Sequence, residues 1–520
     1  MTVMPPTSIQ ATLAPQRIVV VGASLAGLRT AEALRHAGFE GTLTIVGAET
    51  HAPYNRPPLT KASLVDGPDR HNLALPHADL DATWILGVAA TRLDLAHREV
   101  ELDNGESVHF DGLVIATGAS ARRLPADIGD ADVHYIRTLE DAAALHQALT
   151  EPVQRVLVIG AGFLGSEVAS TAAMLGHRVT LVEATAGPML GALGAKVSAY
   201  AAQLHRNHGV DLRTSTTVVS LSRVDGVPGR ATAVLAHHAD ASHSRTHADI
   251  VVAALGAAPN TGWLHGCGVD VDSGVLTDDS LTMLDAEGQP VHGIVAVGDV
   301  ARVPQPLLDG APARVEHWAT AVGHSRIAAA TLIGHERPAG ALLPPFWTDQ
   351  HGVQIRGVGL PGAADTTALV DGAVEDHRFV MTLSRGGRPV GVVAVNNAPA
   401  LLRYRAELET TWKTPPTDTV RTAQMTDTSH SPTLRPTSIK AVRNGPLQLK
   451  GTFRLLDPDG EEYDLGGQRI VLLCRCGQSK NQPFCDSSHV RNVFVTHDQP
   501  TACDQDDVDQ FDTSDDEGAA

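Results

Sequence analysis

The feature that most constrains the fold is a strand, glycine-rich loop and helix pattern that occurs twice. The first copy spans residues 17–46 and the second spans residues 155–182. Duplicated βαβ units predict an α/β protein with two Rossmann-like folds, each holding one nucleotide. The expected segments are strands at 17–22, 43–46, 155–160 and 179–182, and helices at about 26–37 and 164–175.

The first loop, residues 22–27, has Gly22 and Gly27 with Ser24 at the usual position of a middle glycine. Glycines permit a tight turn, and the start of the following helix offers N–H groups and a positive dipole end to a pyrophosphate. Glu49 ends the next strand, where a carboxylate can accept ribose hydroxyls. The alternative is an ordinary strand–turn–helix unit.

The second loop, residues 160–165, carries Gly160, Gly162 and Gly165 in a strand–loop–helix context, which is a strong nucleotide signal. Glu183 ends the next strand, and no Lys or Arg follows it closely. A carboxylate there repels a 2′-phosphate, so we expect NADH rather than NADPH.

Two more segments fit a cofactor site built around these units. Residues 113–118 form a predicted buried strand that ends at Thr117 and Gly118, where the backbone can approach a ligand. Residues 293–299 place Asp299 at another strand end, where it can bond ribityl hydroxyls.

Residues 15–410 resemble the FAD-dependent, NADH-using ferredoxin reductases that serve oxygenases, whose fold resembles glutathione reductase. The segments that carry the resemblance are 22–27, 53–61 (Pro-Tyr-Asn-Arg-Pro-Pro-Leu-Thr-Lys), 116–118, 135–141, 160–167, 256–260, 298–299, 316–318 (Glu-His-Trp) and 346–350 (Phe-Trp-Thr-Asp-Gln). This similarity predicts FAD and NADH as cofactors.

The same resemblance assigns residues to the cofactors. Lys61 is expected beside the isoalloxazine, and Glu167 is expected to face the nicotinamide and to pair with Lys61. A cation near the flavin stabilises its reduced, anionic ring. The alternative for the two is a surface ion pair. The other residues expected to bind cofactors are Arg56, Ala90, Arg137, Gly256, Asp299 and Trp318.

The cysteines separate two kinds of chemistry. Disulfide reductases of this fold need a Cys pair in the first domain, but the first cysteine here is Cys267, which we expect to be a small core or loop residue. Three others gather within residues 474–489, and three thiolates with an imidazole suit a metal. The predicted ligands are Cys474, Cys476, Cys485 and His489.

This spacing, Cys-x-Cys, eight residues, then Cys-x₃-His, resembles the CDGSH iron–sulfur family over residues 438–490, with Ser487 where that family has Gly. The resemblance implies a [2Fe–2S] cluster, and zinc is the alternative. Another group, His237, His238, His243 and His247, lies in a polar stretch that predicts a solvated loop, with metal binding as the alternative.

Composition completes the predicted organisation. The net charge of −19 argues against nucleic acid as a partner. No apolar run is long enough to span a membrane, and the N-terminal residues lack the pattern of a secretory signal, so we expect a cytoplasmic protein. Residues 411–438 hold nine Thr and four Pro and are typical of a linker, while residues 498–520 hold nine acidic residues and no basic ones.

The predicted domains are therefore an FAD domain, an NAD domain, a small α+β interface domain and, after a linker, a small β-rich iron–sulfur domain. Their boundaries are 15–125 with 260–335, then 126–259, 336–412, the linker 413–437, 438–497 and the acidic disordered tail 498–520.

The favoured function is a reductase that passes electrons from NADH through FAD to the fused [2Fe–2S] cluster. The cluster would pass them on to an acceptor protein such as an oxygenase. One alternative is a flavoprotein regulated by a redox-sensing or iron–sulfur-sensing CDGSH segment. Another is an NADH oxidase. Homodimerisation is left open.

Overall fold

The fold is that of a computed structural model of the 520-residue chain, which divides into two compact units, residues 1–416 and 417–520. The described residues are 15–76, 79–224, 230–338, 343–413, 438–441, 446–450, 455, 463, 470–475, 479–480 and 482–485. The predicted acidic tail lies outside them, and so does the predicted linker apart from Lys413. No helix within the described ranges is long and apolar enough to cross a membrane.

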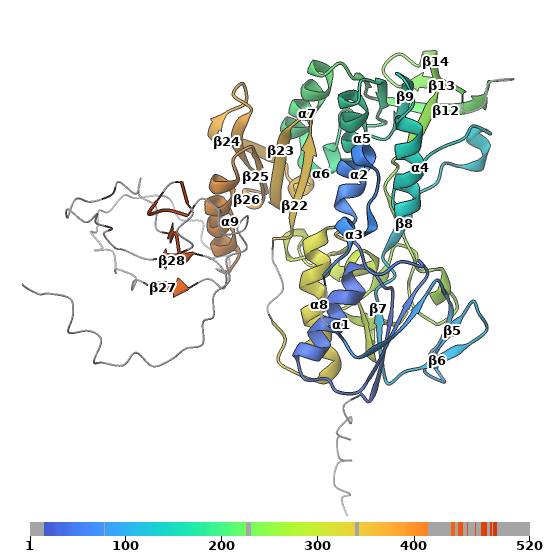
Figure 1. The fold of residues 1–520 in the computed structure, drawn as a ribbon, viewed down its shortest axis with the longest axis vertical. Helices are drawn as coiled ribbons and strands as arrows, with labels where there is room; N and C mark the ends of the chain where they lie inside the picture. Colours follow the sequence, from blue (N-terminus) through green and yellow to red (C-terminus); the bar gives the residue numbers. More distant parts are fainter. Residues whose placement is uncertain are drawn as a thin grey trace, which may run out of the picture. The chain divides into compact units, whose positions relative to one another are not determined.

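The first βαβ unit forms part of a six-stranded sheet in the order β18-β19-β7-β1-β2-β3. Its strands are parallel except β18, and β1 is buried along residues 18–21 because apolar side chains face both sides. Helices α1 and α8 lie side by side against it (Figure 1). The elements are β1 (Arg17–Val21), α1 (Leu25–His36), β2 (Thr42–Gly47), β3 (Ala82–Leu86), β7 (Gly112–Ile115), β18 (Thr282–Leu284), β19 (Pro290–Ala296) and α8 (Trp318–Ile333).

This sheet joins chain segments that are far apart in sequence, because β19 pairs with β7 across the whole second nucleotide unit. Smaller strands surround this sheet, and several of them add side chains to its apolar core. They are β4 (Ala90–Asp94), β5 (Glu99–Leu102), β6 (Ser107–His109), β17 (Val275–Leu276), β20 (Ala301–Pro304) and β21 (Pro312–Ala313). The short helices η1 (Pro57–Thr60), α2 (Ala62–Asp66) and α3 (Arg70–Leu73) instead bury Leu59, Leu64 and Leu73 in the core of the second nucleotide unit.

The second βαβ unit forms a four-stranded parallel sheet in the order β11-β10-β9-β15, with the antiparallel sheet β12-β13-β14 beside it. A two-stranded ribbon, β8 with β16, links the two halves. The elements are β8 (Ala119–Ala121), α4 (Leu139–Leu149), β9 (Arg155–Ile159), α5 (Phe163–Met174), β10 (Arg178–Val182), α6 (Leu190–Leu193), α7 (Ala195–Asn207), β11 (Asp211–Arg213), β12 (Thr216–Arg223), β13 (Ala231–His237), β14 (His243–Ala248), β15 (Ile250–Ala253) and β16 (Ala257–Pro259).

The prediction of a solvated loop over the four histidines was wrong in part. His237 ends β13, whereas His243 and His247 lie on β14, and the hydroxyl of Ser244 bonds His237 Nε2 at 2.7 Å. The two strands pair in register, so the histidines are spread along a hairpin. No metal-binding group of three or more His, Cys, Asp or Glu side chains occurs in the described part of the chain.

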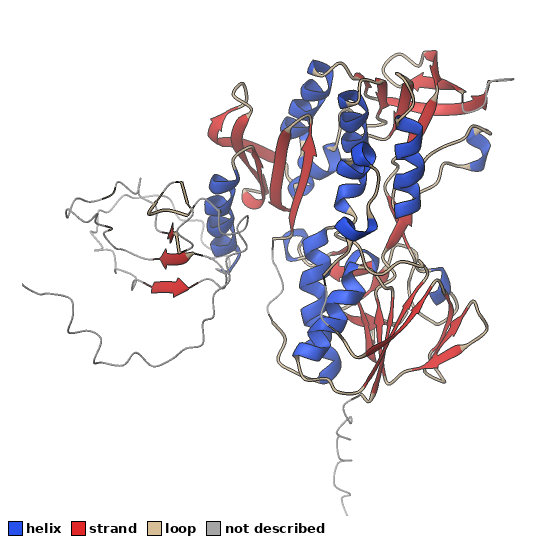
Figure 2. Cartoon of the chain, viewed as in Figure 1, coloured by secondary structure: helices blue, strands red, loops and turns tan. Residues whose placement is uncertain are grey.

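A five-stranded antiparallel sheet in the order β22-β23-β26-β25-β24 follows α8, and α9 packs on it. Its apolar side chains share one core with α7, where the rings of Tyr200 and Phe379 lie 5.0 Å apart. Figure 2 shows this region as mainly strands. The elements are β22 (Pro345–Gln350), β23 (Val353–Gly359), β24 (Thr366–Ala373), β25 (Arg378–Arg385), β26 (Arg388–Val395) and α9 (Ala398–Lys413).

The second unit contains a three-stranded antiparallel sheet of β27 (Ser438–Ala441), β28 (Leu447–Lys450) and β29 (Ile470–Leu473). Leu449 and Val471 pair across it and are buried. Together with the first unit, this architecture confirms the predicted fold class.

Candidate active site

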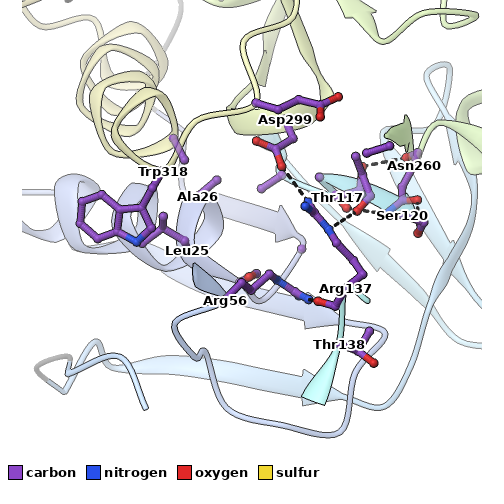
Figure 3. Close-up of a pocket in the computed structure, with 18 of the residues that line it drawn as sticks. Leu25, Ala26, Arg56, Thr117, Ser120, Arg137, Thr138, Asn260, Asp299 and Trp318 are labelled. Carbon is purple, nitrogen blue, oxygen red and sulfur yellow. Dashed lines mark hydrogen bonds and ion pairs between the residues drawn. The ribbon is translucent and has the colours of Figure 1, made fainter. Parts of the chain in front are cut away.

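A cavity of about 830 Å³ opens at the carboxyl ends of the strands in the six-stranded sheet. Loops that follow parallel strands meet at this edge, which is where α/β folds bind nucleotides. Figure 3 shows side chains from both nucleotide halves and from α8 around it. Fourteen of the predicted residues line the cavity: Gly22, Ser24, Glu49, Arg56, Lys61, Ala90, Thr117, Gly118, Arg137, Gly162, Glu167, Gly256, Asp299 and Trp318.

The first glycine loop is shaped by backbone contacts. Gly22 has φ of 121°, and a Cβ there would lie 2.1 Å from the carbonyl oxygen of Ala116, so no other residue fits without displacement. A Cβ on Gly27 would lie 1.9 Å from the Gly22 oxygen. Gly27 is not among the cavity-lining residues; instead it lets α1 approach the loop, and α1 begins at the cavity without a side-chain cap on Ser24.

Two arginines and two carboxylates form a polar wall of the cavity. Arg137 donates to Asp299 at 2.7 Å and to the Ala119 carbonyl at 2.8 Å, and Arg56 donates to the Arg137 carbonyl at 2.6 Å (Figure 3). Arg56 also pairs with Glu49, which accepts the Tyr54 hydroxyl at 2.6 Å.

Guanidinium groups bind phosphates, and carboxylates accept sugar hydroxyls. This wall therefore fits a dinucleotide, with its cations and hydrogen-bond acceptors already gathered on one side of the cavity.

Asn260 is a lining residue that the sequence pattern did not predict. Its amide donates to the Thr117 carbonyl at 2.8 Å and accepts the Ser120 hydroxyl at 2.7 Å, while the Thr117 hydroxyl donates to the Asn260 carbonyl. These bonds hold the turn after β7 against the strand β16. Within the segment 256–260, only Gly256 is a predicted site residue, although the family resemblance of the whole segment could have pointed to Asn260.

Lys61 and Glu167 form an ion pair of 2.6 Å at the cavity, although they lie 106 positions apart. Lys61 follows η1, and Glu167 lies on α5 with 7% of its side chain exposed. The hydroxyls of Thr60 and Thr348 donate to the carboxylate at 2.5 and 2.7 Å. Neither threonine was among the predicted site residues.

The histidines near the cavity are neutral at pH 7. Burial lowers the pKa of His317 and of His324 to about 4, with Asp299 opposing the shift. Burial also raises the pKa of the neighbouring Glu316. The positive charge along the cavity therefore comes from Lys61 and from arginine side chains rather than from these imidazoles.

The second glycine loop meets the cavity only at its tip. Gly162 lines the cavity together with Phe163 and Leu164, whereas Gly160, Gly165 and Glu183 are not among the lining residues. A Cβ on Gly165 would lie 1.9 Å from the Gly160 oxygen, so this glycine serves helix packing. Glu183 accepts the N–H groups of Ala161 and Thr185 at 2.7 and 2.8 Å.

The predicted metal ligands are only partly described. Cys474 donates its N–H to Pro483, and Cys485 donates its N–H to Leu472, each at 2.8 Å, on either side of the antiparallel bridge between residues 473 and 484. This register puts both cysteines on one face as a diagonal pair, roughly 7–8 Å apart. Cys476 and His489 lie outside the described residues.

Three family models match the chain. Residues 16–325 match the pyridine nucleotide-disulphide oxidoreductase family, residues 345–427 match the reductase C-terminal family, and residues 444–490 match the iron-binding zinc finger CDGSH type.

Individual relatives agree with the first two matches. Rhodocoxin reductase of Rhodococcus erythropolis is 38% identical over 387 residues, which is 73% of this chain and 86% of the relative. The ferredoxin–NAD(+) reductase component of the anthranilate 1,2-dioxygenase system of Burkholderia cepacia is 36% identical, over 73% of this chain and 90% of the relative.

The fold also has a close solved counterpart. The crystal structure of the covalent putidaredoxin reductase–putidaredoxin complex aligns with a TM-score of 0.69 and 30% identity, over 76% of this chain and 93% of that chain. No cysteine precedes Cys267 in the first domain, which distinguishes this chain from the disulfide reductases of the fold. The chain belongs to the pyridine nucleotide-disulphide oxidoreductase family, as one of its FAD-dependent ferredoxin reductases, and it carries a C-terminal CDGSH-type iron-binding domain.

Proposed function

We propose that this protein oxidises NADH at the described cavity and delivers electrons, through a fused [2Fe–2S] cluster, to an acceptor protein such as an oxygenase. The observation that carries the proposal is the Lys61–Glu167 ion pair, which lies at the one cavity that both nucleotide loops reach. One of the named relatives is the ferredoxin–NAD(+) reductase component of an anthranilate 1,2-dioxygenase system, which supports the same class of acceptor.

Bound FAD supplies the exchange between a two-electron donor and one-electron acceptors. In the proposed site, Arg56 and Arg137 would bind its phosphates, and Glu49 and Asp299 would accept its sugar and ribityl hydroxyls. Gly118 and Gly256 both have positive φ, and a Cβ on either would have no atom within 4 Å, so the backbone there leaves room for a ligand.

Lys61 has a defined electrostatic role in this proposal. An ammonium has three N–H donors, and two are directed to Glu167 and to the Pro57 carbonyl at 3.2 Å. The third is left for a group in the cavity, where a positive charge favours a reduced, anionic flavin.

The nicotinamide nucleotide is assigned to the second loop. The helix α5 begins after Gly162 without a side-chain cap, so its first N–H groups can receive a pyrophosphate. Glu183 stands at the end of β10, where it favours NADH over NADPH.

The CDGSH segment is proposed to hold one [2Fe–2S] cluster through Cys474, Cys476, Cys485 and His489. The register that puts Cys474 and Cys485 on one face supports a shared metal site for this pair. Anaerobically purified protein should contain iron and acid-labile sulfide in equal amounts. Zinc without sulfide would show that the cluster assignment is wrong.

We propose that the electrons pass between domains with the predicted boundaries. These are an FAD domain (15–125 with 260–335), an NAD domain (126–259), an interface domain (336–412) and a tethered iron–sulfur domain (438–497). Mixing the protein anaerobically with NADH tests this route by following flavin and cluster absorbance. Tethered transfer predicts that the rate constant of cluster reduction does not change with protein concentration.

A chain truncated after Trp412 provides the matched comparison. It should keep flavin reduction by NADH and lose most electron delivery to the acceptor. A full-length protein whose cluster stays oxidised beside a reduced flavin would instead favour a sensing role for the CDGSH domain.

A further inference from the structure

The carboxylate of Glu167 is held by four donors that come from distant parts of the reductase fold. Its Oε2 accepts Lys61 Nζ at 2.6 Å and the Thr60 hydroxyl at 2.5 Å. Its Oε1 accepts the Thr348 hydroxyl at 2.7 Å and the Asp349 N–H at 3.3 Å. The FAD half thus binds one oxygen, and strand β22 of the interface domain binds the other.

The direction of the Thr348 bond is fixed by a second contact. Gln350 Nε2 donates to Thr348 Oγ1 at 3.1 Å, and an amide nitrogen can only donate. The single hydroxyl proton of Thr348 is therefore available for Glu167. Thr348 and Gln350 are 0% and 1% exposed, so water does not compete for these bonds.

Strand β22 is itself anchored to the NAD half. The N–H of His351, in the turn that follows β22, donates to Ser170 Oγ on α5 at 2.7 Å, and its ring bonds His205 of α7 at 3.0 Å. Ser170 lies one helical turn beyond Glu167 on α5. These contacts fix the register in which Thr348 reaches the carboxylate, while Trp347 points to the cavity side.

We propose that Thr348, supported by Gln350, is a positioning residue for the reaction: it holds Oε1 of Glu167 so that Oε2 aligns Lys61 toward the flavin. The interface domain is then part of the site of NADH oxidation and not only a surface for the acceptor. This inference rests on the role proposed above for the Lys61–Glu167 pair.

Thr348→Val removes the hydroxyl while keeping the branched shape, and Thr348→Ser keeps the hydroxyl as the matched control. Loss of a hydrogen bond to a charged group predicts a limiting rate of flavin reduction by NADH that is about 10- to 100-fold lower in Thr348→Val. The apparent dissociation constant for NADH should change less than about 3-fold. Thr348→Ser should recover most of the rate.

A second readout does not depend on turnover. Adding NAD⁺ to the dithionite-reduced protein gives a long-wavelength charge-transfer absorbance that reports the stacking of nicotinamide on flavin. Thr348→Val should weaken or shift this band, and Thr348→Ser should not. FAD content and the thermal midpoint of each variant show whether the fold is retained. If Thr348→Val loses FAD, Gln350→Met tests the same relay and should slow reduction about 3- to 10-fold.

Glu167→Gln separates failure of this inference from failure of the proposed function. If Glu167→Gln reduced its flavin with NADH at the wild-type rate, the ion pair itself would have no role in the reaction. A slow Glu167→Gln beside a Thr348→Val that matches the wild-type protein would overturn only the role of Thr348. The double variant should be no slower than Glu167→Gln, because both changes act through one carboxylate; full additivity would also overturn the inference.

Discussion

The two glycine loops share a sequence pattern but have different surroundings in the fold. The loop after β1 stands over an 830 Å³ cavity that is closed by segments from both nucleotide halves and α8, whereas the loop after β9 reaches that cavity only through its tip. Glu49 is bonded by the side chains of Tyr54 and Arg56, but Glu183 is bonded by backbone N–H groups and Thr185.

This difference fits the proposed roles of the two loops, in which FAD stays bound at the first loop and the nicotinamide nucleotide exchanges at the second. A ligand surrounded by several chain segments loses many contacts on leaving, so it dissociates slowly. We expect a ligand at the second loop, most of which lies outside this cavity, to make fewer such contacts and to exchange at each turnover. We therefore expect the shared motif to bind phosphate in both loops, and the neighbouring segments to determine how long each ligand remains bound.

The largest expected effect is at the first loop, in Gly22→Ala. A Cβ there would lie 2.1 Å from the Ala116 oxygen at a φ of 121°, so the loop must move. We expect a cost of about 3 kcal/mol or more and purified protein that is largely free of FAD. Flavin absorbance relative to protein measures this directly. Full FAD content would show that the first loop tolerates displacement, and would contradict the view that its close backbone contacts are needed to hold FAD.

The next largest effect concerns the nucleotide preference that we predict for Glu183. Its carboxylate should favour NADH over NADPH by about 1–3 kcal/mol, or roughly 10- to 150-fold in kcat/KM. Glu183→Gln should lower the ratio of kcat/KM for NADH to kcat/KM for NADPH, because the repulsion of a 2′-phosphate is removed. Comparable kcat/KM values for the two nucleotides in the unaltered protein would contradict the role given to the second loop.

Acid should lower the stability of the protein through a buried histidine of the NAD half. Burial and the nearby His351 and His208 lower the pKa of His205 to about 3, while an unfolded histidine titrates near 6.5. Between pH 6.5 and pH 3, only the unfolded chain binds this proton. The free energy of unfolding is therefore highest above pH 6.5 and falls as the pH drops toward 3. The contribution of His205 to the loss between pH 7 and pH 5 is about 2 kcal/mol.

Urea unfolding at the two pH values measures this loss, and His205→Gln should reduce it by a similar amount. His317 and His324, beside the FAD cavity, have pKa values lowered to about 4 by burial, so each should add a loss of similar size over the same pH range. An acid loss that His205→Gln leaves intact, but that His317→Gln removes, would place the sensitivity in the FAD half instead.

The smallest expected effect is at the second loop, in Gly162→Ala. This glycine has φ of −68°, and a Cβ would have no atom within 4 Å. The free energy of unfolding should change by less than about 0.5 kcal/mol, and FAD content should be unchanged. A large loss of FAD here, equal to that of Gly22→Ala, would remove the distinction between the loops.

Most elements of the nucleotide halves follow from sequence because their signals are local. Buried strands such as residues 18–21 are uniformly apolar, and Gly22 and Gly160 mark turns that need positive φ. The histidine segment 237–247 shows the limit: the side chains of β14 are polar and largely exposed, so no apolar alternation separates this strand from a solvated loop.

The sequence by itself determined the family, the fold class, the two nucleotide motifs and the order of the metal-type residues, since each depends on neighbours within a few dozen positions. Only the tertiary structure decided which of those residues meet. Glu167 is bonded by Lys61, by Thr60 and by Thr348, and Asn260 closes the turn at Thr117, because sheets and helices fold these distant segments onto one cavity. Hydrogen bonds act over about 3 Å in space, whereas these partners are 106 to 181 positions apart in the chain.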